Sequence, residues 1–274
     1  MIRTRKLELY VISAAFILAL FVTSIFWALN RGGALKHTSS QPSPENTVTM
    51  ASTTKPATPE ATPDPTKSKQ STVVYQGLAK LIEPTAVQAL ILGDAVAESH
   101  GASDKERTSW TTQVANNLKS KYPGTLQWNF KTTAGGTIND VLTYIPEVTK
   151  DTDLIILCLG RNDWAALTTD DFRQKYEQLL AELKSKSPDA NVFLVVEPPV
   201  KSLATNNKSF PYRQVIMDLG QKYKLPVIDE WSAFINDPTP LSNLLVDGLN
   251  PNDKGYQVFA DEVLKKFNEH IAPK

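Results

Sequence analysis

Five short apolar runs, separated by stretches with helical spacing, constrain the fold of this chain more than any other feature. The runs are VQALILG from Val87, LQWNFKT from Leu126, DLIILCLG from Asp153, NVFLVVEP from Asn191 and PVIDEW from Pro226. Near-continuous apolar character is typical of parallel strands that are covered on both faces. The alternation therefore predicts an α/β fold built on a parallel sheet.

The stretches between these runs have apolar residues at helical spacing, and several begin at Thr, Asp or Asn, which cap helices well. They read TSWTTQVANNLKSKY, TINDVLTYIPEV, DDFRQKYEQLLAELKSK, FPYRQVIMDLGQKY and NDKGYQVFADEVLKKFNEHI. We predict one doubly wound, flavodoxin-like domain over residues 73–274, with a five-stranded parallel sheet flanked by helices. Ligands of such folds bind at the carboxyl ends of the strands. One site should therefore be lined by the loops that begin at Gly93, Thr133, Gly160, Glu197 and Leu245.

The N-terminal region has a different character from the rest of the chain. Residues 9–29 carry no charge, and at helical rise they span about 30 Å, the thickness of a bilayer core. They predict a retained transmembrane helix; a cleaved signal peptide is the alternative, although its apolar region is usually shorter. Basic residues in segment 1–8 favour a cytoplasmic N-terminus. The remaining chain is then expected to be extracytoplasmic, held at the cell membrane by a single span.

Residues 30–72 are rich in Ser, Thr, Pro and Lys and have few large apolar side chains. Such a segment buries too little apolar surface to offset the entropy of ordering, so we predict a disordered stalk. A mucin-like glycosylated stalk would have a similar composition.

Overall composition argues against nucleic acid and metal ions as partners. Lys and Arg total 29 and Asp and Glu total 29, so the charge balance gives no indication of nucleic-acid binding. The three histidines are scattered, and no Cys/His spacing predicts a metal site. The single cysteine, Cys158, cannot form an internal disulfide, and its apolar surroundings predict a small buried side chain.

Four of the predicted strand ends carry short polar or glycine-rich motifs. In chain order these are LGDAVAESHG, TTAGGT, LGRNDW and DGLNPNDKGY. Each motif alone has an ordinary interpretation as a turn or as the start of a helix. Their order along the chain, each at a strand end, resembles that of the SGNH/GDSL hydrolases (esterases and lipases).

This resemblance assigns expected roles to particular residues. Gly135 and Asn162 match the residues that donate hydrogen bonds to an oxyanion, and Asp247 matches the triad carboxylate. Ala95 stands where the family has its nucleophilic serine, and Asn250 where it has its histidine base. The family implies no metal or organic cofactor.

These two replacements empty two of the three triad roles, because alanine has no hydroxyl and an amide does not shuttle protons near neutral pH. Loss of the serine or the histidine of such a triad lowers turnover on the order of a millionfold. We therefore predict a catalytically impaired pseudoenzyme. Ser99 and His100, in the same loop as Ala95, are the candidate replacement residues, although adjacent side chains rarely face each other as nucleophile and base require.

A ligand site is nevertheless expected. Its candidate binding residues are Asp94, Trp164, Ser99 and His100, with simple packing as the alternative role for Trp164. We predict a protein that binds an acylated or carbohydrate ligand in a degenerate esterase site. The alternative is an active ester hydrolase or acetylesterase that acts on cell-envelope glycans or small acyl esters through replacement residues, or an engineered inactive form of such an enzyme. A passive spacer domain is the third hypothesis.

Overall fold

The computed structural model describes residues 74–271. The predicted anchor, residues 9–29, and the predicted stalk, residues 30–72, lie outside this range and stay predictions. Within residues 74–271, no helix combines the length and the apolar character needed to cross a bilayer.

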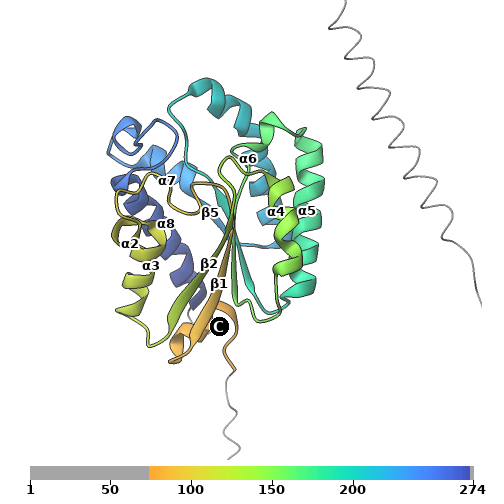
Figure 1. Cartoon of the computed structure of the whole chain (residues 1–274), viewed down its shortest axis with the longest axis vertical. Coiled ribbons are helices and arrows are strands. Elements are labelled where there is room, and N and C mark those ends of the chain that lie inside the picture. Colours follow the sequence, from red (N-terminus) through yellow and green to blue (C-terminus); the bar gives the residue numbers. More distant parts are fainter. Residues whose placement is uncertain (1–73, 272–274) are drawn as a thin grey trace, which may run out of the picture. The chain divides into compact units, whose positions relative to one another are not determined.

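A five-stranded sheet, parallel throughout, forms the centre of the domain (Figure 1). Its spatial order is β2-β1-β3-β4-β5. The strands are β1 (Ala86–Gly93), β2 (Thr125–Thr132), β3 (Leu154–Cys158), β4 (Asn191–Val196) and β5 (Val227–Asp229). The chain reverses direction across the sheet after β2, as in flavodoxin-like folds, which confirms the predicted fold class.

Helices cover both faces of the sheet (Figure 1). One face carries α2 (Lys105–Thr108), α3 (Trp110–Lys119), α7 (Glu230–Asn236) and α8 (Asp253–Ile271). The other face carries α4 (Ile138–Tyr144), α5 (Thr169–Lys186) and α6 (Leu203–Tyr223). Short 3-10 turns are η1 (Gly77–Ile82), η2 (Ile145–Glu147), η3 (Asp163–Ala165) and η4 (Leu241–Asn243).

The core has one apolar layer on each face of the sheet. In the first layer, Trp110 is fully buried, stacks on Phe259 with ring centroids 5.1 Å apart, and donates its indole N–H to the carbonyl of Ala97 at 3.0 Å. In the second layer, Phe172 packs edge-on against Tyr176 at 5.5 Å. Because Ala97 belongs to the loop after β1, this packing also fixes part of the site.

The prediction that all five strands are covered on both faces is wrong for β2. This strand lies at the edge of the sheet, and its residues alternate between half-buried and exposed along most of its length. Leu126 and Trp128 pack toward the first core layer, whereas Gln127 and Asn129 are exposed. The apolar residues of this run cover one face only, as its alternating sequence permits.

Two boundaries also differ from the prediction. The run PVIDEW is a strand only to Asp229, whose carboxylate accepts the N–H of Ser232 at 3.1 Å and so caps α7. Helix α6 begins at Leu203, well before the predicted start at Phe210, because Ser202 caps it and the interior Pro211 does not end it.

Candidate active site

A cavity of about 640 Å³ lies at the carboxyl ends of the strands. Its lining includes Ala95 after β1, Gly135 after β2, Asn162 after β3, Val200 after β4 and Asn250 after β5. The prediction that five loops face one site is therefore confirmed. These loops are brought together by the parallel order of the sheet, although they are far apart in the sequence.

Asp94 organises the floor of this cavity. It is fully buried, and its Oδ1 accepts the N–H of Val96 at 2.8 Å. Its Oδ2 accepts hydrogen bonds from Asn162 Nδ2 at 2.7 Å and from Arg161 at 3.1 Å. Arg161 also donates to the carbonyl oxygen of Leu249 at 2.7 Å. One guanidinium thus ties the loops after β1, β3 and β5 together.

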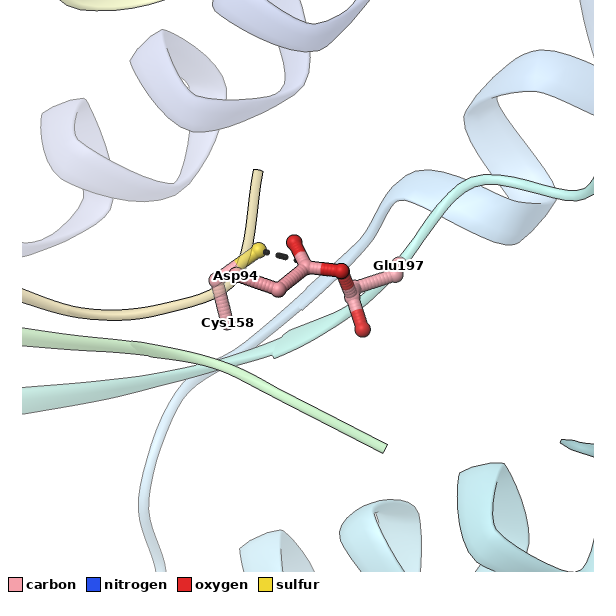
Figure 2. A group of neighbouring side chains, drawn as sticks. All are labelled: Asp94, Cys158 and Glu197. Carbon is pink, nitrogen blue, oxygen red and sulfur yellow. Dashed lines mark hydrogen bonds between the residues drawn. The ribbon is translucent and has the colours of Figure 1, made fainter. Parts of the chain in front are cut away.

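Glu197 lies beside this network at the end of β4 (Figure 2). It is buried and accepts the backbone N–H of Arg161 at 3.1 Å, and the Cys158 thiol donates to it at 3.7 Å. Burial raises the pKa of Glu197 well above its ordinary value, and the nearby charge of Asp94 raises it further. Burial likewise raises the pKa of the Cys158 thiol, so this thiol stays protonated at neutral pH.

The ligand atoms of Asp94, Cys158 and Glu197 lie within 4.8 Å of one another, close enough to surround an ion (Figure 2). The guanidinium of Arg161 already lies 3.1 Å from Asp94 and 4.0 Å from Glu197. A metal ion would have to compete with this fixed positive charge in a desolvated space. The donor set therefore fits a hydrogen-bonded charge cluster better than a metal centre.

Ala95 and Asn250 occupy the positions that the family resemblance assigns to nucleophile and base. Both line the cavity. Asn250 Nδ2 donates to Asp247 Oδ2 at 2.8 Å. The amide of Asn250 thus makes the hydrogen bond to the carboxylate that the family resemblance expects of a histidine. Burial raises the pKa of Asp247, but hydrogen bonds from Asn250 and Leu249 outweigh burial and hold the pKa below its ordinary value. Asp247 is therefore an ionised hydrogen-bond acceptor.

The two expected oxyanion donors differ in availability. Gly135 has a φ of +69°, which favours glycine, and within residues 74–271 its N–H has no hydrogen-bond partner. Asn162 Nδ2 donates to Asp94 and, at 3.1 Å, to the carbonyl of Gly136. Both amide protons of Asn162 are thus engaged inside the protein. A ligand carbonyl would find the Gly135 N–H ready but would have to displace a partner of Asn162.

Asp163 connects two of the loops that line the cavity. Its two carboxylate oxygens accept the N–H groups of Ile138 at 2.8 Å and Gly160 at 3.1 Å. Burial raises its pKa to about 6 despite these bonds. Because Ile138 begins α4, Asp163 joins the glycine-rich loop after β2 to the loop after β3.

Of the remaining candidate residues, Trp164 and His100 line the cavity, whereas Ser99 is buried in the core. Trp164 lines the cavity and also packs against the second core layer, with Lys208 Nζ 4.4 Å from its ring centroid. His100 is exposed and lines the cavity. Ser99 is buried, and its Oγ accepts the N–H of Trp110 at 3.3 Å. Its hydroxyl is turned into the core, so this geometry does not support Ser99 as a nucleophile.

Arg161 and Glu197 were missed as site residues by sequence reasoning. Arg161 fills the variable position of the LGRNDW motif, and Glu197 directly follows an apolar strand. A charged residue at the carboxyl end of a buried strand was the available signal for Glu197. The signal for Arg161 was weaker, because its side chain is held by the carboxyl groups of Asp94 and Glu197, which only the fold brings together.

Comparison with known proteins agrees with this geometry. Residues 91–258 match the GDSL-like lipase/acylhydrolase family. The chain belongs to this family. No curated protein sequence matches it. The family match spans all five loops that line the cavity, including the motif that contains Asp247 and Asn250.

Solved structures of the same fold include several esterases. A lipase/acylhydrolase from Enterococcus faecalis has a TM-score of 0.57 at 19% identity, over 69% of this chain and 98% of its own. The acetylxylan esterase Axe2 from Geobacillus stearothermophilus has a TM-score of 0.56 at 17% identity, over 69% and 97%. A two-domain esterase active on acetylated mannans has a TM-score of 0.54 at 18% identity, over 69% and 50%. These similarities show the shared fold.

Proposed function

We propose that this GDSL-family chain is a membrane-anchored, extracytoplasmic protein that binds an acylated or carbohydrate ligand and is catalytically impaired. The observation that supports the proposal is a cavity lined by Ala95 and Asn250, the residues that the family resemblance assigns to the nucleophile and base positions, with Asn250 bonded to Asp247. Binding a ground-state ligand needs neither a nucleophile nor a base.

The ligand class is supported by the cavity and by the similar structures. A volume of about 640 Å³ lies within the range of small-molecule sites. Two proteins of the same fold are described as an acetylxylan esterase and as an esterase active on acetylated mannans. An acetylated carbohydrate is accordingly the ligand that we propose.

An active ester hydrolase that uses replacement residues is the second candidate. His100 lines the cavity, but the buried Ser99 does not. The proposed replacement pair, Ser99 and His100, is therefore not brought together in the cavity, and this candidate has less support than the binding function.

Hydrolysis of p-nitrophenyl acetate tests the proposal. The full chain in detergent is compared with the double variant Ala95→Ser, Asn250→His. We expect negligible turnover by the wild type and an increase of at least about a hundredfold in the double variant, well below the roughly millionfold contribution of an evolved triad.

Two single variants serve as controls. Ser99→Ala should leave the rates of both proteins unchanged, because its hydroxyl faces Trp110. Wild-type turnover that disappears in Ser99→Ala or His100→Ala would contradict catalytic impairment. A correctly folded double variant with no activity would contradict an intact catalytic frame.

A further inference from the structure

The side-chain amide of Asn250 has a defined orientation. Its Nδ2 donates to Asp247 Oδ2 at 2.8 Å. Turning the amide over would place two acceptor oxygens against each other, so the carboxylate fixes which end is nitrogen. The Oδ1 atom must then point away from Asp247.

This oxygen is available to a ligand. Asn250 is only 8% exposed, and what is exposed borders the cavity that it lines. Among residues 74–271, no group donates a hydrogen bond to Asn250 Oδ1, and this atom is not fully enclosed by protein. The base position of the family therefore holds a neutral acceptor whose direction is set by Asp247.

The loop that carries Asn250 is fixed by several further bonds. The N–H of Asn250 donates to Asp247 Oδ1 at 2.7 Å, and its carbonyl accepts the N–H of Val246 at 3.0 Å. Arg161 holds the carbonyl of the neighbouring Leu249 at 2.7 Å. An acceptor held this firmly costs little to order when a ligand binds.

The same cavity also offers donors. Ala95 and Gly135 both line it, and in the described part of the chain neither backbone N–H has a hydrogen-bond partner. These groups suit a carbonyl oxygen. Together with Asn250 Oδ1, they give the site donors for a C=O and an acceptor for an N–H.

We infer that this site recognises an N-acyl group, such as the acetamido group of an amino sugar, in preference to the corresponding O-acyl ester. The inference rests on the proposed binding function and specifies its ligand. An amide supplies both a carbonyl for Gly135 and an N–H for Asn250. An ester has an oxygen in place of that N–H, which leaves Asn250 Oδ1 facing a second acceptor and without a partner.

A matched pair of glycosides tests this preference by ligand-observed NMR on the full chain in detergent. The probes are methyl 2-acetamido-2-deoxy-β-D-glucoside and methyl 2-O-acetyl-β-D-glucoside, which differ in one N–H against one oxygen. We expect the amide to bind about tenfold more tightly, as one satisfied hydrogen bond against one unpaired acceptor implies.

The variant Asn250→Leu keeps a similar side-chain volume and removes the acceptor. The ratio of the two dissociation constants should fall to near one in this variant and stay at the wild-type value in Asn268→Leu, an exposed position on α8. The ratio is informative because a general loss of structure would weaken both probes alike.

Three outcomes separate the hypotheses. A preference for the amide that Asn250→Leu abolishes supports the inference. Equal binding, or tighter binding of the ester, by the wild type overturns it and leaves the proposed function standing. Binding of neither glycoside overturns both the inference and the proposed carbohydrate ligand. The wild-type ratio decides the matter even if Asn250→Leu does not fold.

Discussion

Glu197 and Asp94 are two buried carboxyl groups that share one nearby cation, Arg161. Two ionised carboxylates here would leave an uncompensated negative charge in a desolvated space, which is costly. Burial and the charge of Asp94 raise the pKa of Glu197 well above its ordinary value of 4.5. Folding therefore favours the protonated form of Glu197, which the unfolded chain loses at a lower pH than the folded protein does.

This proton makes stability depend on pH. The stabilisation from the protonated Glu197 is complete below pH 4.5, the ordinary pKa, and is lost as pH rises toward the raised pKa of the folded state. We expect the free energy of unfolding to fall as the pH rises above 4.5 toward the raised pKa, by up to about 1.4 kcal/mol per pH unit from this group. Glu197→Gln, which is permanently neutral, should remove this part of the slope in urea denaturation.

The matched control is Glu83→Gln, because Glu83 is exposed. Its pH dependence should follow the wild type. Identical slopes for the wild type and Glu197→Gln would show that Glu197 is ionised in the folded protein.

Helix α6 approaches β5 closely at one position. A Cβ added at Gly220 would lie 2.3 Å from Cγ2 of Val227, which is too short for two carbon atoms. In an exposed helix, replacing glycine by alanine stabilises by about 1 kcal/mol. Here the overlap with a short, branched side chain outweighs that gain.

We therefore expect Gly220→Ala to destabilise the protein by roughly 1–3 kcal/mol in urea denaturation. Adding Val227→Ala removes the overlapping methyl groups, so the double variant should be more stable than the sum of the two single changes predicts. If the free-energy changes of the two single variants simply add up in the double variant, the overlap between positions 220 and 227 does not destabilise the protein, and this explanation is wrong.

At the level of elements, the sequence predicted the parallel sheet and the convergence of five loops, because apolar periodicity is a local property and the carboxyl ends of parallel strands meet at one edge of a sheet. The coverage of β2 was mispredicted, since edge position depends on the order of all five strands. The early start of α6 was missed because Pro211 reads as a boundary, although Ser202 caps the helix upstream. The engagement of Asn162 by Asp94 depends on side-chain directions that a motif does not specify.

At the level of the whole chain, residues 9–29 form the proposed membrane anchor. Removing residues 1–36 should move the protein from the membrane pellet to the soluble fraction after cell disruption, because the apolar span is then missing. The two core layers described above are built from residues within 74–271, so we expect the circular dichroism of the domain and its thermal transition to be kept.

A neutral substitution within the span provides the control. Ala15→Leu keeps the apolar character of residues 9–29, so the full chain with this change should stay in the pellet. A truncated protein that still sediments with membranes would indicate attachment through another part of the chain.

The bonds that Arg161 makes to Asp94, Glu197 and Leu249 involve neither the side chain of Ala95 nor that of Asn250. Selection on folding alone would therefore preserve the surroundings of these two positions. Two substitutions, at Ala95 and Asn250, would place a hydroxyl and an imidazole at these positions. Under the proposed function, this arrangement would make a loss of turnover reversible for as long as the guanidinium keeps its carboxyl partners.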